Sequence, residues 1–163
     1  MTSIKKNSIS IYIIFITLLV CIDQLTKQAI YNLSNGRLLY SKSIIGDFFR
    51  ITYIENHGGI FGLAQGHIIW FTIISTAMII YIYLTELKNF RSYSMINKIA
   101  VSFIISGAIG NMLDRYIRGY VIDMLDFRAI WSFIFNVADV YINIGIYILI
   151  IAYILKYLKE KKG

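Results

Sequence analysis

The sequence predicts an all-α membrane protein with four transmembrane helices and a small β-structured element outside the membrane. Of its 163 residues, 58% are hydrophobic and none is proline. The apolar residues gather in four long blocks, and a bilayer core about 30 Å thick needs roughly 20 such residues per helix. The length suits one domain covering residues 1–163. The predicted spans are residues 9–31, 67–85, 98–117 and 134–155.

A soluble helical bundle is the alternative to this membrane fold. Helices of soluble proteins carry an apolar stripe and an opposite polar face. Residues 71–84 and 141–155 are instead apolar nearly all round. Helices of that kind are typical of membrane spans, so the hydropathy pattern favours the membrane protein.

The net charge of +7 fits a membrane topology better than a nucleic-acid partner. Basic residues mark the cytoplasmic side of membrane proteins, and most of them here lie at three places that share one side of a four-span chain. Both termini are therefore predicted to be cytoplasmic. The basic residues concerned are Lys5 and Lys6 before the first block, Lys88, Arg91 and Lys98 between the second and third, and Lys156, Lys159, Lys161 and Lys162 after the fourth.

The first block is predicted to be an uncleaved helix. Its basic start and apolar core are also typical of a secretory signal, but bulky Val20 before Cys21 fits a lipoprotein cleavage box poorly. Asp23 and Lys27 near its end are four residues apart, so they share a helix face and can pair. An ordinary ion pair at the membrane interface is the simplest interpretation of that spacing.

Residues 32–66 form a region predicted to hold a small β-element on the outer side. Asn35-Gly36 and Gly46-Asp47 are turn signals, and residues 49–54 are rich in strand formers. A glycine-rich loop follows at residues 55–62, which we expect to dip toward the helices. His57 in this loop is a candidate ligand or base, although a single histidine there more often has neither role.

The third and fourth blocks carry polar residues at helical spacing. Small residues along the third block, such as Gly107 and Gly110, allow close approach of another helix. Arg118 also fits a charged helix end that reaches the membrane interface. The polar positions are Asn111, Asp114, Arg115 and Arg118 in the third block, and Asn136, Asp139 and Asn143 in the fourth.

The topology brings two carboxylates to the same membrane surface. Asp123 lies in the outer connection between the last two blocks, and Asp139 lies about one turn inside the fourth. Two close carboxylates share one proton, as in aspartic proteases. Spacing alone leaves Asp126 and Asp114 as competitors, and an ion or proton pathway explains buried charge equally well. The two histidines and one cysteine are scattered, so no metal site is predicted.

Five motifs in order resemble the lipoprotein signal peptidase family, the type II signal peptidases of bacteria, over nearly the whole chain. The third is Gly107-Ala-Ile-Gly-Asn-Met-Leu-Asp-Arg115. The others are Asp23-Gln-Leu-Thr-Lys27, Asn56-His-Gly-Gly-Ile-Phe61, Gly119-Tyr-Val-Ile-Asp-Met124 and Phe135-Asn-Val-Ala-Asp139.

The resemblance implies an aspartyl endopeptidase of the bacterial cytoplasmic or inner membrane. Its substrates would be diacylglyceryl-modified prolipoproteins, cut just before the lipidated cysteine, and it would work as a monomer among membrane lipids without cofactor or metal. Asp123 and Asp139 match the catalytic pair of the family, so the resemblance implies that Asp126 is not catalytic. Matches to residues that line or support the site are Asp23, Asn56, Gly58, Asn111, Asp114, Arg115 and Asn136.

The chain departs from the family pattern at a few positions. Gly59-Ile60 replaces the usual Ala-Ala, Met124 replaces Phe, and the segment between the two aspartates is short and lacks a proline. These departures motivate an alternative, a degenerate relative that binds inhibitor or substrate without turnover. The retained aspartates argue against it.

Overall fold

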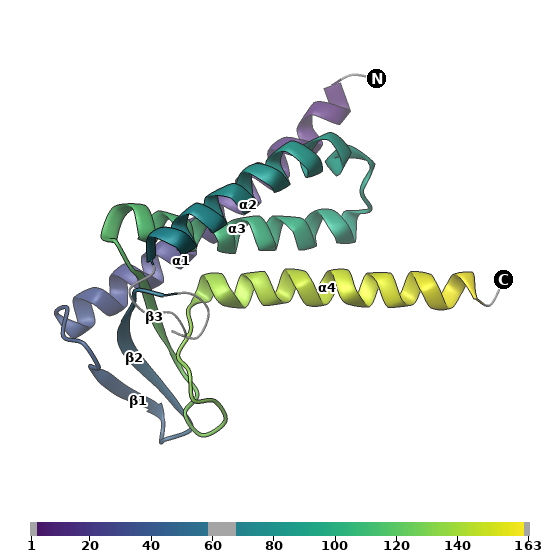
Figure 1. Ribbon diagram of the computed structural model, residues 1–163. Coiled ribbons are helices and arrows are strands. Elements are labelled where there is room, and N and C mark those ends of the chain that lie inside the picture. The colour runs from purple at the N-terminus through teal and green to yellow at the C-terminus, as the bar shows by residue number, and fades with distance from the viewer. Residues whose placement is uncertain (1–2, 59–67, 162–163) are drawn as a thin grey trace.

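Long helices and a small antiparallel sheet make up the described part of the chain (Figure 1). The structure, a computed structural model, describes residues 3–58 and 68–161. The elements are α1 (Ser3–Ser34), β1 (Ser41–Ile45), β2 (Phe49–Asn56), α2 (Ile68–Asn89), the short 3-10 helix η2 (Phe90–Ser92), α3 (Met95–Arg118), β3 (Val121–Asp126) and α4 (Val137–Glu160).

Each predicted span corresponds to a helix, with shifted ends. Ser10–Ser34 within α1, all of α3 and all of α4 are long and apolar enough to cross a bilayer. Within α2 the apolar helical stretch Ile69–Ile82 is shorter, so a crossing by all four helices stays a prediction. Helix α1 continues to Ser34, three residues past the predicted end, and α4 starts at Val137 rather than 134.

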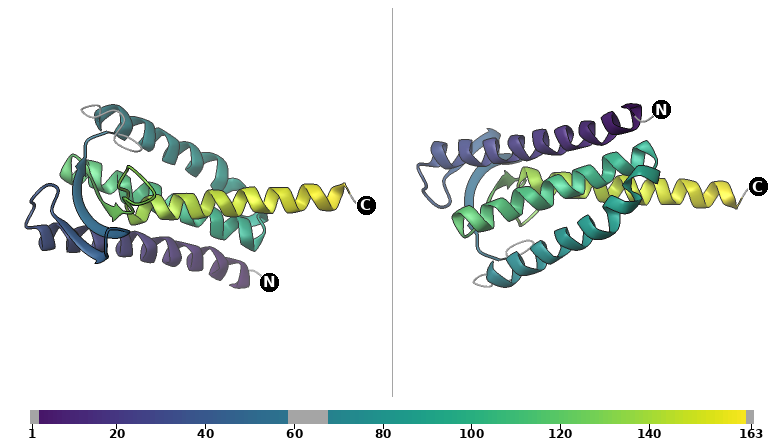
Figure 2. Two further views of the ribbon diagram at one scale, coloured as in Figure 1. Left: turned by 90° about the horizontal axis from the view of Figure 1, so that it is seen from below. Right: turned by 90° about the horizontal axis from the view of Figure 1, so that it is seen from above.

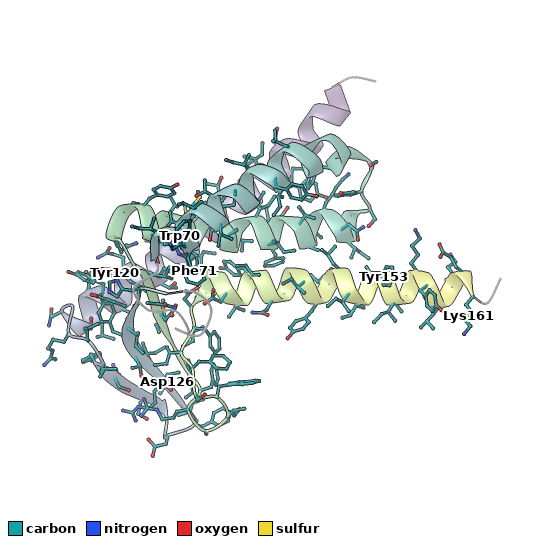
Figure 3. The ribbon with its side chains drawn as sticks, in the orientation of Figure 1. Trp70, Phe71, Tyr120, Asp126, Tyr153 and Lys161 are labelled. Carbon is teal, nitrogen blue, oxygen red and sulfur yellow. The ribbon has the colours of Figure 1, made fainter. Side chains whose placement is uncertain are left out.

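The outer surfaces of these helices are apolar. Tyr153 on α4, labelled in Figure 3, is 71% exposed. Leu155 and Ile151 on the same helix are also exposed. A continuous apolar surface of this kind suits contact with lipid, which supports a multi-pass membrane protein.

Glycines let α3 approach its neighbours closely, as its small residues predict. A Cβ atom on Gly107 would lie 2.2 Å from the carbonyl oxygen of Ala138 on α4. One on Gly110 would lie 2.5 Å from Oδ2 of Asp23 on α1. Helix α3 therefore contacts both α1 and α4 at distances that other side chains would prevent.

The sheet contains a strand that the sequence analysis did not predict. Its order is β1-β2-β3, with both pairs antiparallel, so residues from outside 32–66 complete it. The predicted β-element at 32–66 is confirmed by β1 and β2, and β3 extends it beyond that region. Gly119 ends α3 in a left-handed conformation with φ of 77°, which turns the chain directly into β3.

The sheet packs against the last turns of α1. Ile30 of α1 and Tyr53, Ile122 and Met124 of the sheet form a buried apolar cluster. Met124, one of the departures from the family pattern, is thus a core residue of this cluster. All three views place the sheet at one end of the helices and both chain ends at the other (Figures 1 and 2).

Candidate active site

Asp123 lies in the middle of β3 with its carboxylate buried. The strand alternation places Ile122 and Met124 in the apolar cluster and Asp123 on the opposite face. The side-chain amide of Asn56 donates to Oδ2 of Asp123 at 2.9 Å, and that of Asn136 donates to Oδ1 at 2.6 Å. Both carboxylate oxygens therefore have a partner.

Asp139 lies in the first turn of α4. Its Oδ2 accepts from the backbone N–H of Asn136 at 3.2 Å, and its own N–H donates to the Asn136 side-chain oxygen at 3.0 Å. These reciprocal bonds form a capping box. The amide of Asn111 on α3 donates to Oδ1 of Asp139 at 2.8 Å. Both oxygens of Asp139 therefore accept N–H donors at the N-terminus of α4.

Asn136 connects the two carboxylates. Its amide nitrogen contacts Asp123 while its amide oxygen and backbone N–H contact Asp139. Phe135 just before it pairs with Leu125 of β3 through backbone bonds of 2.7 and 3.2 Å, which hold the start of α4 against the strand. The structure thus brings Asp123 and Asp139 to the same place, as topology predicts.

Asp123 holds its proton more strongly than an ordinary carboxyl. Burial, followed by the negative charge of Asp139, raises the pKa of Asp123 from 3.8 to about 7. The amide donors from Asn56 and Asn136 oppose this increase without cancelling it. Near neutral pH the pair can therefore hold one proton and one negative charge.

The folded protein should lose stability as Asp123 loses this proton. Between pH 3.8 and about 7 the folded state binds a proton that the unfolded chain has released, so the free energy of unfolding should fall with rising pH. Above about pH 7, Asp123 contributes no further change in the free energy of unfolding. The Asp123→Asn variant should show a flatter dependence, measured by thermal unfolding in detergent at a series of pH values. Identical slopes for the two proteins would contradict the raised pKa.

Asp23 and Asp114 belong to a buried ion network that ties three helices together. Lys27 contacts Oδ2 of Asp23 and Oδ2 of Asp114, each at 2.9 Å, and all three side chains have no exposure. Oδ1 of Asp23 also accepts the backbone N–H of Ala138 at 2.9 Å. The interpretation of Asp23 and Lys27 as an interfacial pair was therefore wrong, because both lie inside the helix packing.

Arg118 and Gln24 complete this network. Arg118 pairs with Oδ1 of Asp114 and donates to Gln24 at 3.1 Å. Its side chain is 17% exposed. Arg118 lies in the last turn of α3, as predicted for a charged helix end, and Asp114 binds it there. Its reach to the membrane interface stays a prediction. The N–H of Ile122 donates to Asp114 at 3.2 Å, so Asp114 also holds the start of β3.

Arg115 and Gly58 lie close to the two carboxylates. Arg115 donates to the backbone oxygen of Asn111 at 3.1 Å, and its buried Nε has no hydrogen-bond partner within residues 3–58 and 68–161. The N–H of Gly58 donates to the side-chain oxygen of Asn56 at 2.9 Å, which orients the amide toward Asp123. The substituted pair Gly59-Ile60 lies outside the described residues.

Asp126 and His57 have other partners. Asp126 accepts from Thr52 at 2.6 Å and pairs with Arg128. Figure 3 shows Asp126 on the part of the sheet far from the helices, while Tyr120 lies near them. Nε2 of His57 lies 3.7 Å from a Glu55 oxygen. Across the described ranges, His, Cys, Asp and Glu side chains form no group of three suited to a metal ion.

The sequence analysis missed how Lys27 and Asn136 connect the site. It paired Lys27 with Asp23 only, although the lysine also contacts Asp114 and Asn111. A lysine within an apolar helix, on the face of an aspartate, is a signal for such a buried network. The link through Asn136 depends on the helix cap and on β3, so residue spacing alone does not reveal it.

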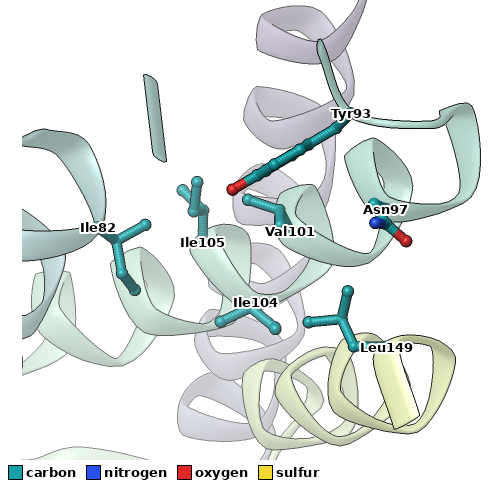
Figure 4. A pocket seen from close by; sticks show the side chains of 7 residues that line it. All are labelled: Ile82, Tyr93, Asn97, Val101, Ile104, Ile105 and Leu149. Carbon is teal, nitrogen blue, oxygen red and sulfur yellow. The ribbon is translucent and has the colours of Figure 1, made fainter. Parts of the chain in front are cut away.

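An apolar cavity lies apart from these residues. It is lined by Ile82 of α2, Val101, Ile104 and Ile105 of α3 and Leu149 of α4, with Tyr93 and Asn97 (Figure 4). None of its lining residues belongs to the carboxylate pair or the ion network. Its polar lining residues are Tyr93 and Asn97, and none of the residues that line it is a carboxylate.

The fold and the site define a multi-pass membrane protein with a buried pair of hydrogen-bonded carboxylates. The family model of signal peptidase (SPase) II matches residues 15–155. The chain belongs to this family and is a membrane peptidase.

Relatives and solved structures agree with this assignment. The lipoprotein signal peptidase of Fusobacterium nucleatum is 45% identical over 154 residues, covering 94% of this chain and 92% of the relative. That of Clostridioides difficile is 39% identical over 135 residues, covering 83% and 88%. A bacterial membrane enzyme solved at 2.3 Å has a TM-score of 0.82, 29% identity and coverage of 95% and 94%. Another, solved at 1.9 Å, has a TM-score of 0.76, 31% identity and coverage of 89% and 93%.

Proposed function

We propose that this chain is an aspartyl endopeptidase that removes signal peptides from diacylglyceryl-modified prolipoproteins, cutting just before the lipidated cysteine. The observation that carries the proposal is the pair Asp123 and Asp139, joined through Asn136. Family membership supports the substrate class, since the relatives are lipoprotein signal peptidases.

The two carboxylates take different parts in hydrolysis. Asp139 is the base, because its charge raises the pKa of Asp123 and the shared proton then resides on Asp123. It takes a proton from water, whose oxygen attacks the scissile carbonyl carbon. Asp123 is the acid, because burial and the neighbouring charge hold its proton up to a pKa of about 7. It donates that proton to the developing oxyanion. Asp139 then passes the proton it took from water to the leaving amine, the C–N bond breaks, and Asp123 recovers its proton as the carbonyl re-forms.

The remaining site residues hold this pair or meet the substrate. Arg115 supplies a cation with a buried donor, suited to a substrate carbonyl. Asp23 and Asp114 fix α1, α3 and α4 relative to one another. Those that orient the carboxylates are Asn56, Gly58, Asn111 and Asn136.

The membrane position of the site suits a lipid-anchored substrate. A prolipoprotein lies in the bilayer with its modified cysteine near the outer surface. The site lies at the sheet end of the helices, and both chain ends lie at the other (Figure 1). Both termini are then cytoplasmic, the sheet is extracytoplasmic, and one monomeric domain with four spans contains every group that the reaction needs.

Lipid dependence and cleavage position test the proposal together. The purified enzyme in detergent should cut a diacylglyceryl precursor and leave the same precursor without its lipid essentially uncut. Mass spectrometry should find the lipidated cysteine as the new N-terminus. Binding of the lipidated precursor without cleavage would support a degenerate relative. Cleavage elsewhere, or of both precursors equally, would overturn the proposed specificity.

A further inference from the structure

Lys27 is a buried cation whose three N–H donors are all used. Its Nζ contacts Oδ2 of Asp23 at 2.9 Å and Oδ2 of Asp114 at 2.9 Å. Its third partner is the side-chain oxygen of Asn111 at 3.0 Å. An ammonium group has three donors and accepts nothing, so this lysine is fully satisfied by groups of α1 and α3.

The third contact fixes which way the amide of Asn111 faces. Because an ammonium cannot accept a hydrogen bond, the Asn111 oxygen must point to Lys27 and its NH₂ group must point away. That NH₂ group donates to Oδ1 of Asp139 at 2.8 Å. The reverse orientation would place NH₂ against an ammonium and an oxygen against a carboxylate. Lys27 therefore determines the hydrogen bond that Asp139 receives.

The network stays balanced in charge if Lys27 and Asp23 lose their charges together. Asp23 and Asp114 face Lys27 and Arg118, two negative and two positive groups. Removing the charges of Asp23 and Lys27 together leaves the ion pair of Asp114 and Arg118 intact. A variant that removes the cation without stranding a buried anion is therefore available.

We propose that Lys27 is a positioning residue for the reaction: it acts through Asn111 to hold Asp139 in place as the base. This inference rests on the proposed aspartyl function. Lys27 then does more than join the helices. The ammonium group that binds Asp23 and Asp114 also makes Asn111 turn its NH₂ group toward Asp139.

A double-mutant cycle tests this role. Lys27→Met and Asn111→Ala should each lower kcat by about 10- to 100-fold, with KM within about threefold, since a small misplacement of a reacting group costs this much. If Lys27 acts through Asn111, the double variant should be no slower than the Asn111→Ala enzyme. Rates are compared per folded molecule. If the two losses multiply instead, Lys27 has only a structural part and the inference fails.

A second pair of variants covers the case in which Lys27→Met does not fold. Asp23→Asn with Lys27→Met removes both charges, and the asparagine oxygen can still accept the N–H of Ala138. The double variant should have a lower kcat than Asp23→Asn alone. When Asn111→Ala is present in both enzymes, this difference in kcat should disappear. If it persists there, or if kcat is unchanged, the inference is overturned. If the unaltered enzyme cleaves no lipidated precursor, the proposed function fails instead.

Arg118→Gln is the matched control. Arg118 pairs with Asp114 in the same network, and it contacts Asp114, Gln24 and Gln28 rather than Asn111. This variant should lower the melting temperature while kcat stays within about threefold of the unaltered enzyme. A loss of kcat as large as that of Lys27→Met would show that any damage to the network acts on the reaction, and would contradict a specific role for Lys27.

Discussion

Cleavage by the Asp139→Asn variant should fall by about 10³-fold or more, because the base that activates water is lost. Asparagine has nearly the same volume and keeps an oxygen that can accept the N–H of Asn136, so α4 should stay capped. Asp123→Asn should cause a loss of similar size. The double variant should be no slower than either single one, since the two groups act as a unit. Product formation from a lipidated precursor, measured by mass spectrometry, gives the rates.

Asp126→Asn is the matched control for this prediction. Asp126 is a buried carboxylate on the same strand as Asp123, but its partners are Thr52 and Arg128. The variant should lose stability by about 1–3 kcal/mol through the weakened bonds and keep nearly full activity per folded molecule. Loss of activity in Asp126→Asn, or retained activity in Asp139→Asn, would show that the catalytic pair has been assigned to the wrong residues.

Gly107→Ala should both destabilise the protein and damage the site. The added Cβ would meet the carbonyl oxygen of Ala138 at 2.2 Å, and backbone cannot rotate away as a side chain can. Overpacking of this kind costs about 1–3 kcal/mol or more. Ala138 adjoins Asp139, so the shift should also move the base and lower kcat by about 10- to 100-fold. Melting temperature and kcat per folded molecule are measured together.

Gly145→Ala separates the two effects. Its Cβ would meet the carbonyl oxygen of Ala100 at 2.5 Å, a similar clash between the same two helices, at a distance from the carboxylates along α4. It should lower the melting temperature comparably and leave kcat within about threefold. If both glycine variants lose kcat equally, the helix spacing affects the site as a whole, and the specific effect at Ala138 is disproved.

The helices could be predicted from sequence because their signal is local. Continuous apolar runs such as 141–155 need no partner to be recognised as spans. Strand β3 has no such local signal. Its six residues lie between a charged helix end and a loop, and they form a strand only because they pair with β2. Composition likewise did not decide whether α2 crosses the membrane, since its apolar stretch is shorter than those of the other three helices.

The candidate site was predictable where motifs specify residue types and not where contacts depend on geometry. Asp123 and Asp139 follow from topology and from the family motifs. Asn136 was predicted to line the site, but its simultaneous bonds to both aspartates require a helix cap placed beside a strand. The interfacial interpretation of Lys27 failed because spacing along α1 cannot show that α3 covers that face.

The position of Asp139 in the first turn of α4 has a consequence for biosynthesis. One acid of the pair comes from a strand that follows α3, while the other lies on the final helix, which must leave the ribosome and enter the bilayer before the two can meet. A nascent chain that lacks α4 has no second carboxylate to share the proton. Under the proposed aspartyl mechanism, the peptidase is therefore inert until α4 is inserted.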